Sequence, residues 1–361
     1  MSLATDIHSR ICEVANDGVH GLDRAELVPE IRRLVCEVAP LTPSGEIAEV
    51  VDEVMAHIDG LGPLHHLALE SGVSEIMVNG DGSVFVEANG ELRRTERVLG
   101  QDETLHLARR LASRAGRRID AARPAVDVRL DDGSRLHAVI PPLAVDGPHL
   151  TIRRFTDKSI TLAELADPQA ASLLEAAVVD RATVIVAGAT SSGKTTLLNA
   201  LGAAISNRER VVTIEDAAEL RLPGEHIVRL ETRPAAEGLA AVGVRELVRH
   251  ALRMRPDRII CGEMRGAEAF DLVQAMNTGH AGSLSTLHAN GASDAMRRIE
   301  TMMLLADAEL PLPAIREQLA TCVDLVVFMA RGENGARRVQ TIHEVPDRPT
   351  PGWDLIERFV S

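Results

Sequence analysis

The segment at residues 188–195 constrains this chain more than any other feature. It reads Gly-Ala-Thr-Ser-Ser-Gly-Lys-Thr and fits the GxxxxGK[ST] pattern at every fixed position. The apolar run 183–187 before it predicts a buried strand, and residues 196–205 after it predict a helix with one apolar face. Because strand, loop and helix follow one another in this order, the sequence predicts a loop that binds phosphate.

Each part of this loop has an expected task. Gly188 and Gly193 let the backbone turn its N–H groups toward phosphate oxygens, and the start of the helix adds positive potential. Lys194 is expected to contact the β- and γ-phosphates of ATP, and Thr195 to ligate Mg²⁺. The residues predicted to bind nucleotide are Gly188, Ala189, Thr190, Ser191, Ser192, Gly193, Lys194, Thr195 and Thr196. A chance Gly/Ser turn is the alternative, and the strand in front of the loop argues against it.

Two further apolar strands end in carboxylates. Strand 211–214 is followed by Glu215, and strand 258–261 is followed, after one glycine, by Glu263. Ligands of parallel sheets bind at the carboxyl ends of the strands. Glu263 is therefore predicted to be the main catalytic carboxylate and to contact Mg²⁺ through water, and Glu215 to be its partner and a second candidate contact for Mg²⁺. Capping of a helix by Asp216 is the alternative for the first strand.

A third segment, residues 277–290, carries two histidines. A lone histidine usually has a structural role, but His280 and His288 flank a strand of small hydroxyl residues in a P-loop domain. This pairing favours contact with a phosphate, and His288 joins the catalytic candidates. A zinc site is not expected, because no cysteine or third histidine has ligand spacing. Arg265 is compatible with a phosphate contact or with a surface ion pair.

Composition limits the class of protein. The formal charge is −14 and aromatic residues are 2% of the chain, with no tyrosine. Both values argue against nucleic acid as the partner. Four scattered cysteines without a CxxC pair indicate reduced thiols of a cytosolic protein. No apolar run approaches the ~18 residues of a membrane span and no signal peptide is visible, so direct membrane insertion is not expected.

The chain divides by pattern into a helical N-terminal appendage (1–58), a smaller α+β domain (59–155), a polar linker (156–160) and an α/β P-loop domain (161–361). Short strands separated by Asn-Gly and Asp-Gly turns define the second part. A capping box formed by Thr161 and Glu164 starts the fourth part. Its alternation of strands and helices, to about residue 330, predicts a parallel sheet covered by helices.

Together these segments resemble the secretion-superfamily ATPases, the hexameric motors of type II secretion, type IV pili and type IV secretion. In that family's terms, Gly188–Thr195 is similar to Walker A, Thr213–Leu220 to the Asp box, Ile259–Glu263 to Walker B and Gly279–Asn290 to the His box.

Within this family, residues 55–330 resemble most the Tad (tight adherence) pilus branch, the CpaF-type ATPases. The resemblance rests on Glu75–Gly80, Val126–Arg135, Ala138–Pro142, Leu150–Phe155, Arg229–Arg233 and Arg265–Glu268. The P-loop domain has no tetracysteine zinc element, and in this it departs from many type II secretion and pilus-extension members.

The resemblance implies a RecA-like P-loop ATPase domain preceded by a PAS-like α+β domain. It implies a cytoplasmic homo-hexamer, peripheral at the inner face of the cytoplasmic membrane, that hydrolyses MgATP and acts on an inner-membrane platform protein. The work done would be assembly, and as a further expectation retraction, of a Tad or type IV-like pilus. Arg135 and Arg153 would close on the phosphates, with Arg154 and Arg229 as further matches. For each arginine, a plain surface charge is the alternative.

Other functions are weighed against this one. The first alternative is a type IV secretion or conjugation-type ATPase that handles a protein or DNA substrate. A kinase is another, but no feature of an acceptor site is visible. A scaffold without enzymatic activity does not fit the presence of both Lys194 and Glu263.

Overall fold

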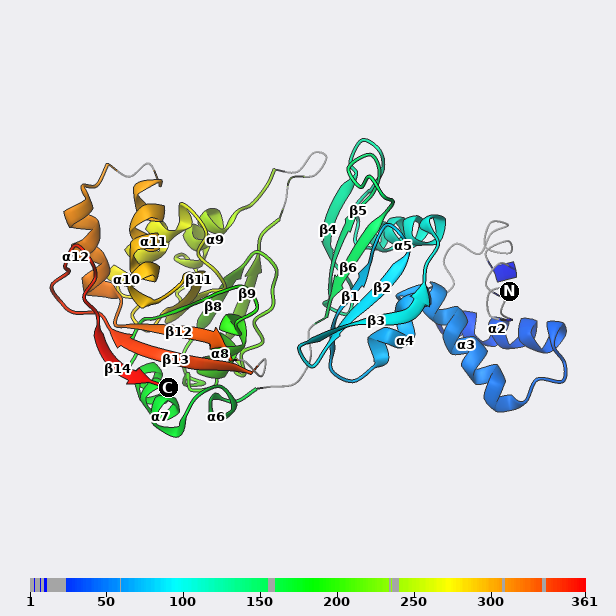
Figure 1. The fold of residues 1–361 in the computed structure, drawn as a ribbon, viewed down its shortest axis with the longest axis horizontal. Helices are drawn as coiled ribbons and strands as arrows, with labels where there is room; N and C mark the ends of the chain where they lie inside the picture. Colours follow the sequence, from blue (N-terminus) through cyan, green and yellow to red (C-terminus); the bar gives the residue numbers. More distant parts are fainter. Residues whose placement is uncertain are drawn as a thin grey trace. The chain divides into compact units, whose positions relative to one another are not determined.

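The computed structural model describes residues 3, 7, 10, 11, 24–58, 60–154, 160–233, 235, 240–306, 309–332 and 336–361. The chain forms two compact units, Met1–Thr156 and Asp157–Ser361, called here the N-terminal and C-terminal units and described separately (Figure 1). Of the expected linker, 156–160, residues 156–159 lie outside the described residues.

The N-terminal unit contains a helical hairpin, α2 (Arg24–Val38) and α3 (Ser44–Ile58). Apolar residues at helical spacing put one face of each helix against the other, and Ile31 and Val35 are buried with Val51 and Val54. Ile7 and Ile11, which precede the hairpin, are buried in the same apolar cluster.

A six-stranded antiparallel sheet follows the hairpin. The elements are η1 (Gly62–Leu64), α4 (His65–Leu69), β1 (Val73–Val78), β2 (Ser83–Ala88), β3 (Glu91–Val98), α5 (Gln101–Arg114), β4 (Ala125–Arg129), β5 (Arg135–Val139) and β6 (His149–Arg153). The strand order is β3-β2-β1-β6-β5-β4. Leu107 and Leu111 of α5 pack on Ile76, Leu136 and Ile152 of the sheet. Strands that alternate buried and exposed residues, such as β4, therefore have one solvated face.

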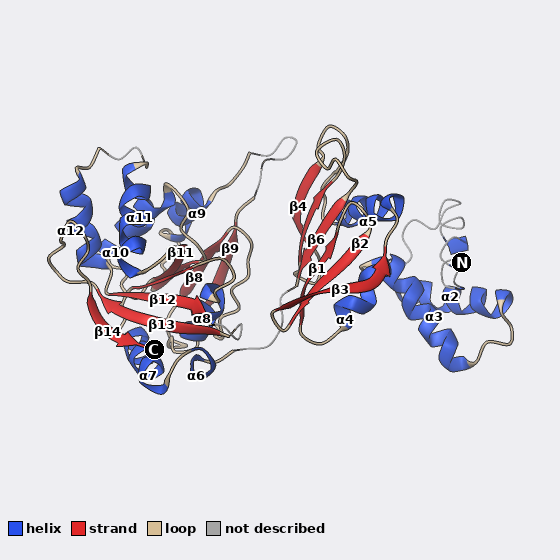
Figure 2. Cartoon of the chain, viewed as in Figure 1, coloured by secondary structure: helices blue, strands red, loops and turns tan. Residues whose placement is uncertain are grey.

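The C-terminal unit is an eight-stranded mixed sheet with helices on both faces (Figure 2). Its elements are α6 (Leu162–Leu165), α7 (Pro168–Val179), β7 (Val184–Gly188), α8 (Lys194–Gly202), β8 (Val211–Glu215), β9 (Ile227–Glu231), α9 (Val244–Ala251), β10 (Arg258–Cys261), α10 (Glu268–Asn277), β11 (Leu284–His288), α11 (Ala292–Leu304), α12 (Leu312–Cys322), β12 (Leu325–Arg331), β13 (Arg337–Glu344) and β14 (Ile356–Val360). The predicted capping box is present, since the Thr161 N–H donates to Glu164 Oε2 at 2.8 Å.

Strand order in this sheet is β14-β13-β12-β7-β11-β10-β8-β9, and neighbours from β12 to β9 run parallel. The parallel sheet predicted from the alternation up to about residue 330 is confirmed for β7 to β12, and the later strands β13 and β14 pair antiparallel. The reason is local: only residues 332–336 separate β12 from β13, and a connection that short returns the chain antiparallel.

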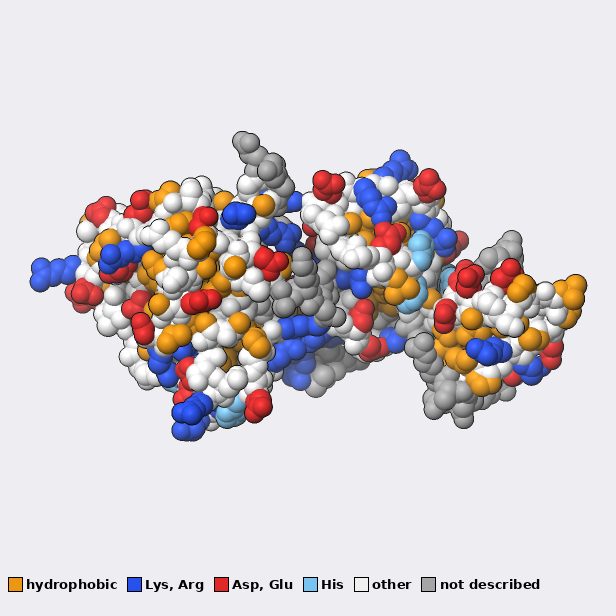
Figure 3. Space-filling view, turned by 90° about the horizontal axis from the view of Figure 1, so that it is seen from below, with side chains coloured by type: hydrophobic (Ala, Val, Ile, Leu, Met, Phe, Trp, Pro, Cys, Tyr) orange, Lys and Arg blue, Asp and Glu red, His pale blue; other side chains and the backbone are white. Residues whose placement is uncertain are grey.

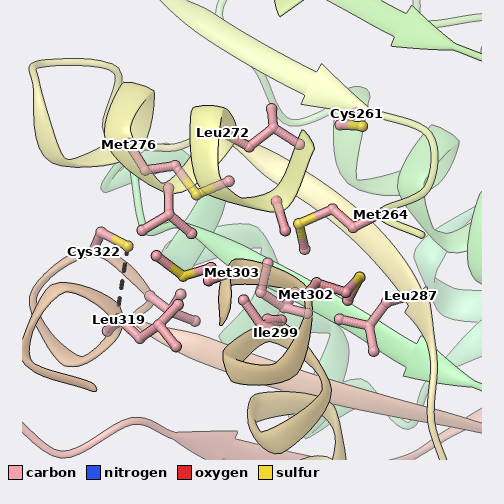
Figure 4. Close-up of a cluster of buried hydrophobic side chains, with 14 of the residues drawn as sticks. Cys261, Met264, Leu272, Met276, Leu287, Ile299, Met302, Met303, Leu319 and Cys322 are labelled. Atoms are coloured by element: carbon pink, nitrogen blue, oxygen red, sulfur yellow. Dashed lines mark hydrogen bonds between the residues drawn. The ribbon is translucent and has the colours of Figure 1, made fainter. Parts of the chain in front are cut away.

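Both faces of the sheet are covered by apolar helix surfaces. Helices α9 to α12 pack on one face through a methionine-rich cluster (Figure 4), and α6 to α8 pack on the other. Burial on both sides explains why all five residues of β7 are buried. Because β7, β8, β10 and β11 run parallel, their C-terminal ends lie at one edge of the sheet, next to the loop that follows β7.

Candidate active site

The phosphate-binding loop between β7 and α8 is shaped by two glycines. Gly188 has φ +158°, and a Cβ there would lie 2.5 Å from Met329 O and 2.6 Å from Ser192 Oγ. Gly193 has φ +95°, a left-handed conformation that side chains disfavour. Residues 189–191 are exposed at the loop tip. The backbone therefore turns tightly and leaves the tip open.

Lys194 points back over this loop. Its Nζ donates to Gly188 O at 3.1 Å and to Ala189 O at 2.8 Å, and it lies 3.3 Å from His288 Nδ1. The residue is 7% exposed, and burial lowers the pKa of its ammonium. Three acceptors thus stand around the three N–H bonds of the charged group.

His288, at the end of β11, joins Lys194 to Glu263. Its Nε2 lies 3.2 Å from Glu263 Oε1. Burial, and then the nearby Lys194 charge, lower the pKa of the imidazole, so its neutral form is favoured. Because an ammonium only donates, we assign Nδ1 as the acceptor and Nε2–H as the donor to the carboxylate.

Glu263 is held through the backbone of its two neighbours and through its own carboxylate. Thr286 of β11 accepts from Met264 N at 2.8 Å through its carbonyl and donates from Oγ1 to Gly262 O at 2.7 Å. Arg265 Nη2 donates to Glu263 Oε2 at 2.9 Å. The carboxylate is therefore fixed from both sides, by His288 and by Arg265.

Arg265 also donates from Nη1 to Asp216 Oδ2 at 2.8 Å. Arg265 therefore bridges Asp216, which follows β8, and Glu263, which follows β10. The sequence left Arg265 between a phosphate contact and an ion pair, and Asp216 between a carboxylate of the ligand site and a helix cap. Two opposite charges after neighbouring parallel strands were the available signal, but side-chain direction is not visible in a sequence.

Glu215 has a different environment from Glu263. It is 3% exposed, and its Oε2 accepts from the N–H groups of Glu219 and Leu220 at 2.7 and 2.9 Å. Its Oε1 is buried without a hydrogen-bond partner among the described residues. Burial raises the pKa of this carboxyl to about 7. These contacts hold residues 216–220 rather than reach toward Lys194.

The loop offers fitting groups for a phosphate and a magnesium ion. Ser192 Oγ is buried without a hydrogen-bond partner in the described part of the chain. Thr195, at the start of α8, and Glu263 supply hydroxyl and carboxylate oxygens, which are the ligand type that Mg²⁺ prefers. Thr196, next in α8, is half-buried. These groups are chemically compatible with phosphate and Mg²⁺.

His280 does not join the cluster. It precedes β11, whereas His288 ends that strand, so the two histidines lie at opposite edges of the sheet. His280 Nδ1 is 3.0 Å from Ala275 O at the end of α10, which is a structural contact. The structure therefore brings only His288 to Lys194.

The candidate arginines of the N-terminal unit are held in ion pairs. Arg135 makes two bonds to Asp127, each 2.7 Å long, and Arg153 Nε lies 2.9 Å from Glu75 Oε1. The two arginines are paired residues of β5 and β6. They form one charged row on the sheet, and their role toward a nucleotide stays a prediction.

The other two arginines bind carbonyl groups. Arg154 Nη1 donates to Val73 O at 3.4 Å, and Arg229 Nη2 donates to Ala218 O at 2.8 Å. Arg229 therefore supports the same 216–220 segment that Glu215 holds.

A family model described as Type II/IV secretion system protein matches residues 57–336. The chain belongs to this family. A Mycobacterium tuberculosis protein named as a conjugal transfer protein is 42% identical over 302 residues, which are 80% of this chain and 85% of that protein. The type IV secretion system protein PtlH of Bordetella pertussis is 36% identical over 325 residues, covering 81% of this chain and 96% of that protein.

The fold is shared with a solved ATPase. The X-ray structure of the ATPase DotB of Legionella pneumophila superposes with a TM-score of 0.56 at 21% identity, and the match covers 81% of each chain. In the described part of this chain, no helix is both long enough and apolar enough to cross a bilayer.

The raised pKa of Glu215 predicts a pH-dependent stability. The unfolded carboxyl ionises near pH 4.5, whereas the folded one does so near pH 7. The folded state therefore loses stability as pH rises through this window, by at most about 3 kcal/mol. Glu215→Gln, neutral throughout, is expected to remove this loss. Urea unfolding between pH 5 and pH 8, followed by fluorescence of the single tryptophan, Trp353, measures it.

The exposed Glu175 of α7 provides the control. Glu175→Gln is expected to keep the pH dependence of the unmodified protein. Equal pH dependence in Glu215→Gln and Glu175→Gln would show that Glu215 ionises normally.

Proposed function

We propose that this protein is a motor ATPase that hydrolyses MgATP. One observation carries the proposal: a complete phosphate loop, with its lysine joined through His288 to the carboxylate of Glu263. Phosphoryl chemistry depends mainly on positioning and on electrostatic stabilisation, and these groups supply both. Membership of the secretion family supports the same reaction.

In this proposal Lys194 exchanges partners. In the structure, its Nζ contacts Gly188 O, Ala189 O and His288 Nδ1. A triphosphate offers stronger, charged acceptors, so the ammonium moves to the phosphate oxygens. His288 then loses its contact with Lys194 and keeps the one with Glu263.

Glu263 is the proposed catalytic carboxylate, which orients the attacking water and accepts its proton. Arg265 and His288 hold it in one orientation. Thr195 and Glu263, the latter through water, would hold Mg²⁺, which neutralises charge on the phosphates when bound. For Glu215 we propose a positioning role, because it binds the backbone of residues 219 and 220.

We propose a RecA-like domain at 161–361 and a PAS-like domain at 59–155, after the helical appendage and before the linker at 156–160. The proposed working form is a cytoplasmic homo-hexamer at the inner face of the cytoplasmic membrane, where it contacts an inner-membrane platform protein. Closure of the N-terminal domain would bring Arg135 and Arg153 to the phosphates. In the structure these two arginines are held in ion pairs, Arg135 with Asp127 and Arg153 with Glu75.

Two machines fit such a motor. The resemblance of the motifs favours a machine that assembles a Tad or type IV-like pilus. Retraction of the pilus is a further proposed task. The names of the relatives in M. tuberculosis and B. pertussis favour a type IV secretion or conjugation-type machine that handles protein or DNA. The charge of −14 favours a protein substrate over DNA in either case.

Removing the charge of Glu263 tests the reaction. Glu263→Gln keeps the shape of the side chain but cannot accept a proton, so kcat is expected to fall by roughly a hundredfold or more. Binding of a fluorescent ATP analogue is expected to change little. The two measurements are phosphate release and fluorescence titration with Mg²⁺ present.

Glu175→Gln, on the exposed face of α7, is the matched control and should hydrolyse ATP normally. Turnover by Glu263→Gln within a few-fold of this control would remove Glu263 from its proposed role.

The effect of DNA on the rate of ATP hydrolysis distinguishes a pilus motor from a conjugation-type motor. A pilus motor is expected to hydrolyse ATP at the same rate with and without added single- or double-stranded DNA. A reproducible several-fold stimulation that disappears at high salt would instead support a conjugation-type motor that contacts DNA.

A further inference from the structure

The phosphate-binding loop has a neighbour from a distant part of the sequence. A Cβ at Gly193 would lie 3.2 Å from the Cβ and 3.3 Å from the Cδ of Arg337, the first residue of β13. It would also lie 3.3 Å from the Cε of Met329. The stem of Arg337 therefore runs along the backbone of Gly193, and the glycine leaves room for it. The proposed ATPase reaction assigns no task to this arginine.

The strand register places Arg337 on the loop side of the sheet. Val339, two residues further along β13, pairs with Met329 of β12, and both are buried in the apolar cluster under α6 to α8. Residues two apart on a strand share a face of the sheet. Arg337 therefore lies on the face that α8 covers, and α8 is the helix that begins directly after Gly193. The side chain is half-buried there.

The strand order puts Arg337 and the proposed catalytic groups on opposite sides of the loop. Strand β7, which leads into the loop, lies between β11 and β12, and β13 lies beyond β12. His288 ends β11 and Glu263 follows β10, so both belong to the first side. Because β13 runs antiparallel to β12, its first residue lies at the edge where β7 ends. With the γ-phosphate directed at Glu263, the base end of a nucleotide points to the side of β12 and β13.

The aromatic side chains of the C-terminal unit are committed to its apolar clusters. Phe270, Phe328 and Trp353 belong to the cluster under α9 to α12, and Phe359 packs against the cluster under α6 to α8. The sequence contains no tyrosine. A nucleotide base still needs a flat partner, and a guanidinium is planar and stacks on aromatic rings. Arg337 supplies such a plane beside the loop.

Stacking does not require an excess of positive charge around Arg337. The segment 331–338 carries three arginines and one glutamate, and charged side chains of both signs are interspersed over the face of the molecule in Figure 3. A base contacts the flat face of a guanidinium, whereas hydrogen bonds and ion pairs use its N–H edge. A bond from that edge to another group is therefore compatible with a base on the face.

We propose that Arg337 binds the base of the nucleotide: its guanidinium stacks on the purine while its stem packs on Gly193. The assignment rests on the proposed ATPase function and adds the side chain that holds the end of the nucleotide away from the reacting phosphate. Lys194 and the loop bind the phosphates, and Arg337 binds the nucleoside part. Arg337 thus contributes to affinity for the nucleotide and not to the chemical step.

Titration calorimetry of the full chain with two ligands tests this assignment. One ligand is MgADP, and the other is magnesium tripolyphosphate, which has phosphates but no base. Arg337→Gln is expected to bind MgADP about tenfold more weakly, because a stacking contact is lost, and to bind tripolyphosphate as the unmodified protein does. Arg337→Lys should restore little of the affinity for MgADP, since an ammonium keeps the charge but has no flat face.

Arg338→Gln is the matched control, because Arg338 is exposed, pairs with Ala330 and lies on the opposite face of β13. It should bind both ligands normally, and thermal melting verifies that each variant is folded.

Three results would overturn the assignment and leave the ATPase function intact. They are equal affinity for MgADP in Arg337→Gln and Arg338→Gln, an equal loss of tripolyphosphate binding in Arg337→Gln, and full affinity for MgADP in Arg337→Lys. Absence of binding of both ligands to the unmodified chain would instead contradict the ATPase function, and the assignment of Arg337 with it.

Discussion

The charge of Lys194 organises the candidate site. Lys194 is only 7% exposed, so its ammonium needs hydrogen-bond acceptors. Two carbonyl groups of the phosphate-binding loop and one nitrogen of His288 supply them. That contact decides which nitrogen of His288 carries the proton, and the proton-bearing nitrogen then faces Glu263. Arg265 continues the row to Asp216. One buried cation thus sets the orientation of side chains that follow three strands.

The fold makes this row possible because parallel strands deliver their last residues to one edge. Glu215 ends β8, Glu263 follows β10 and His288 ends β11, beside the loop that leaves β7. Helices on both faces keep the strands apolar, so polar groups concentrate where the strands stop. Thr286 then connects β11 to the turn after β10 and fixes the backbone of Glu263.

Sequence reasoning succeeded where a residue type has one physical use. The loop needs glycine at 188 and 193, and the structure shows the close contact at the first and the positive φ at both. Sequence reasoning was less informative about the direction in which a side chain points. Glu215 and Glu263 follow equivalent strands, yet only Glu263 meets His288, because Glu215 turns inward to cap two backbone N–H groups.

Other features left weak or ambiguous signals. His280 and His288 look equivalent in sequence, but a strand lies between them and separates them by its length. Strand β3 is exposed at nearly every residue, so no alternation revealed it. The antiparallel pairing of β13 with β12 depends on a short connection whose effect on the sheet is tertiary. The predicted contact of Arg135 and Arg153 with a nucleotide depends on how the two units are placed, and local sequence patterns do not encode that placement.

The most direct measurement is a crystal structure of the full chain with Mg²⁺ and a non-hydrolysable ATP analogue. The account predicts that Lys194 Nζ leaves Gly188 O, Ala189 O and His288 Nδ1 and binds the β- and γ-phosphates, while His288 and Arg265 still hold Glu263. A nucleotide bound elsewhere, with Lys194 still on the two carbonyls and His288, would contradict it.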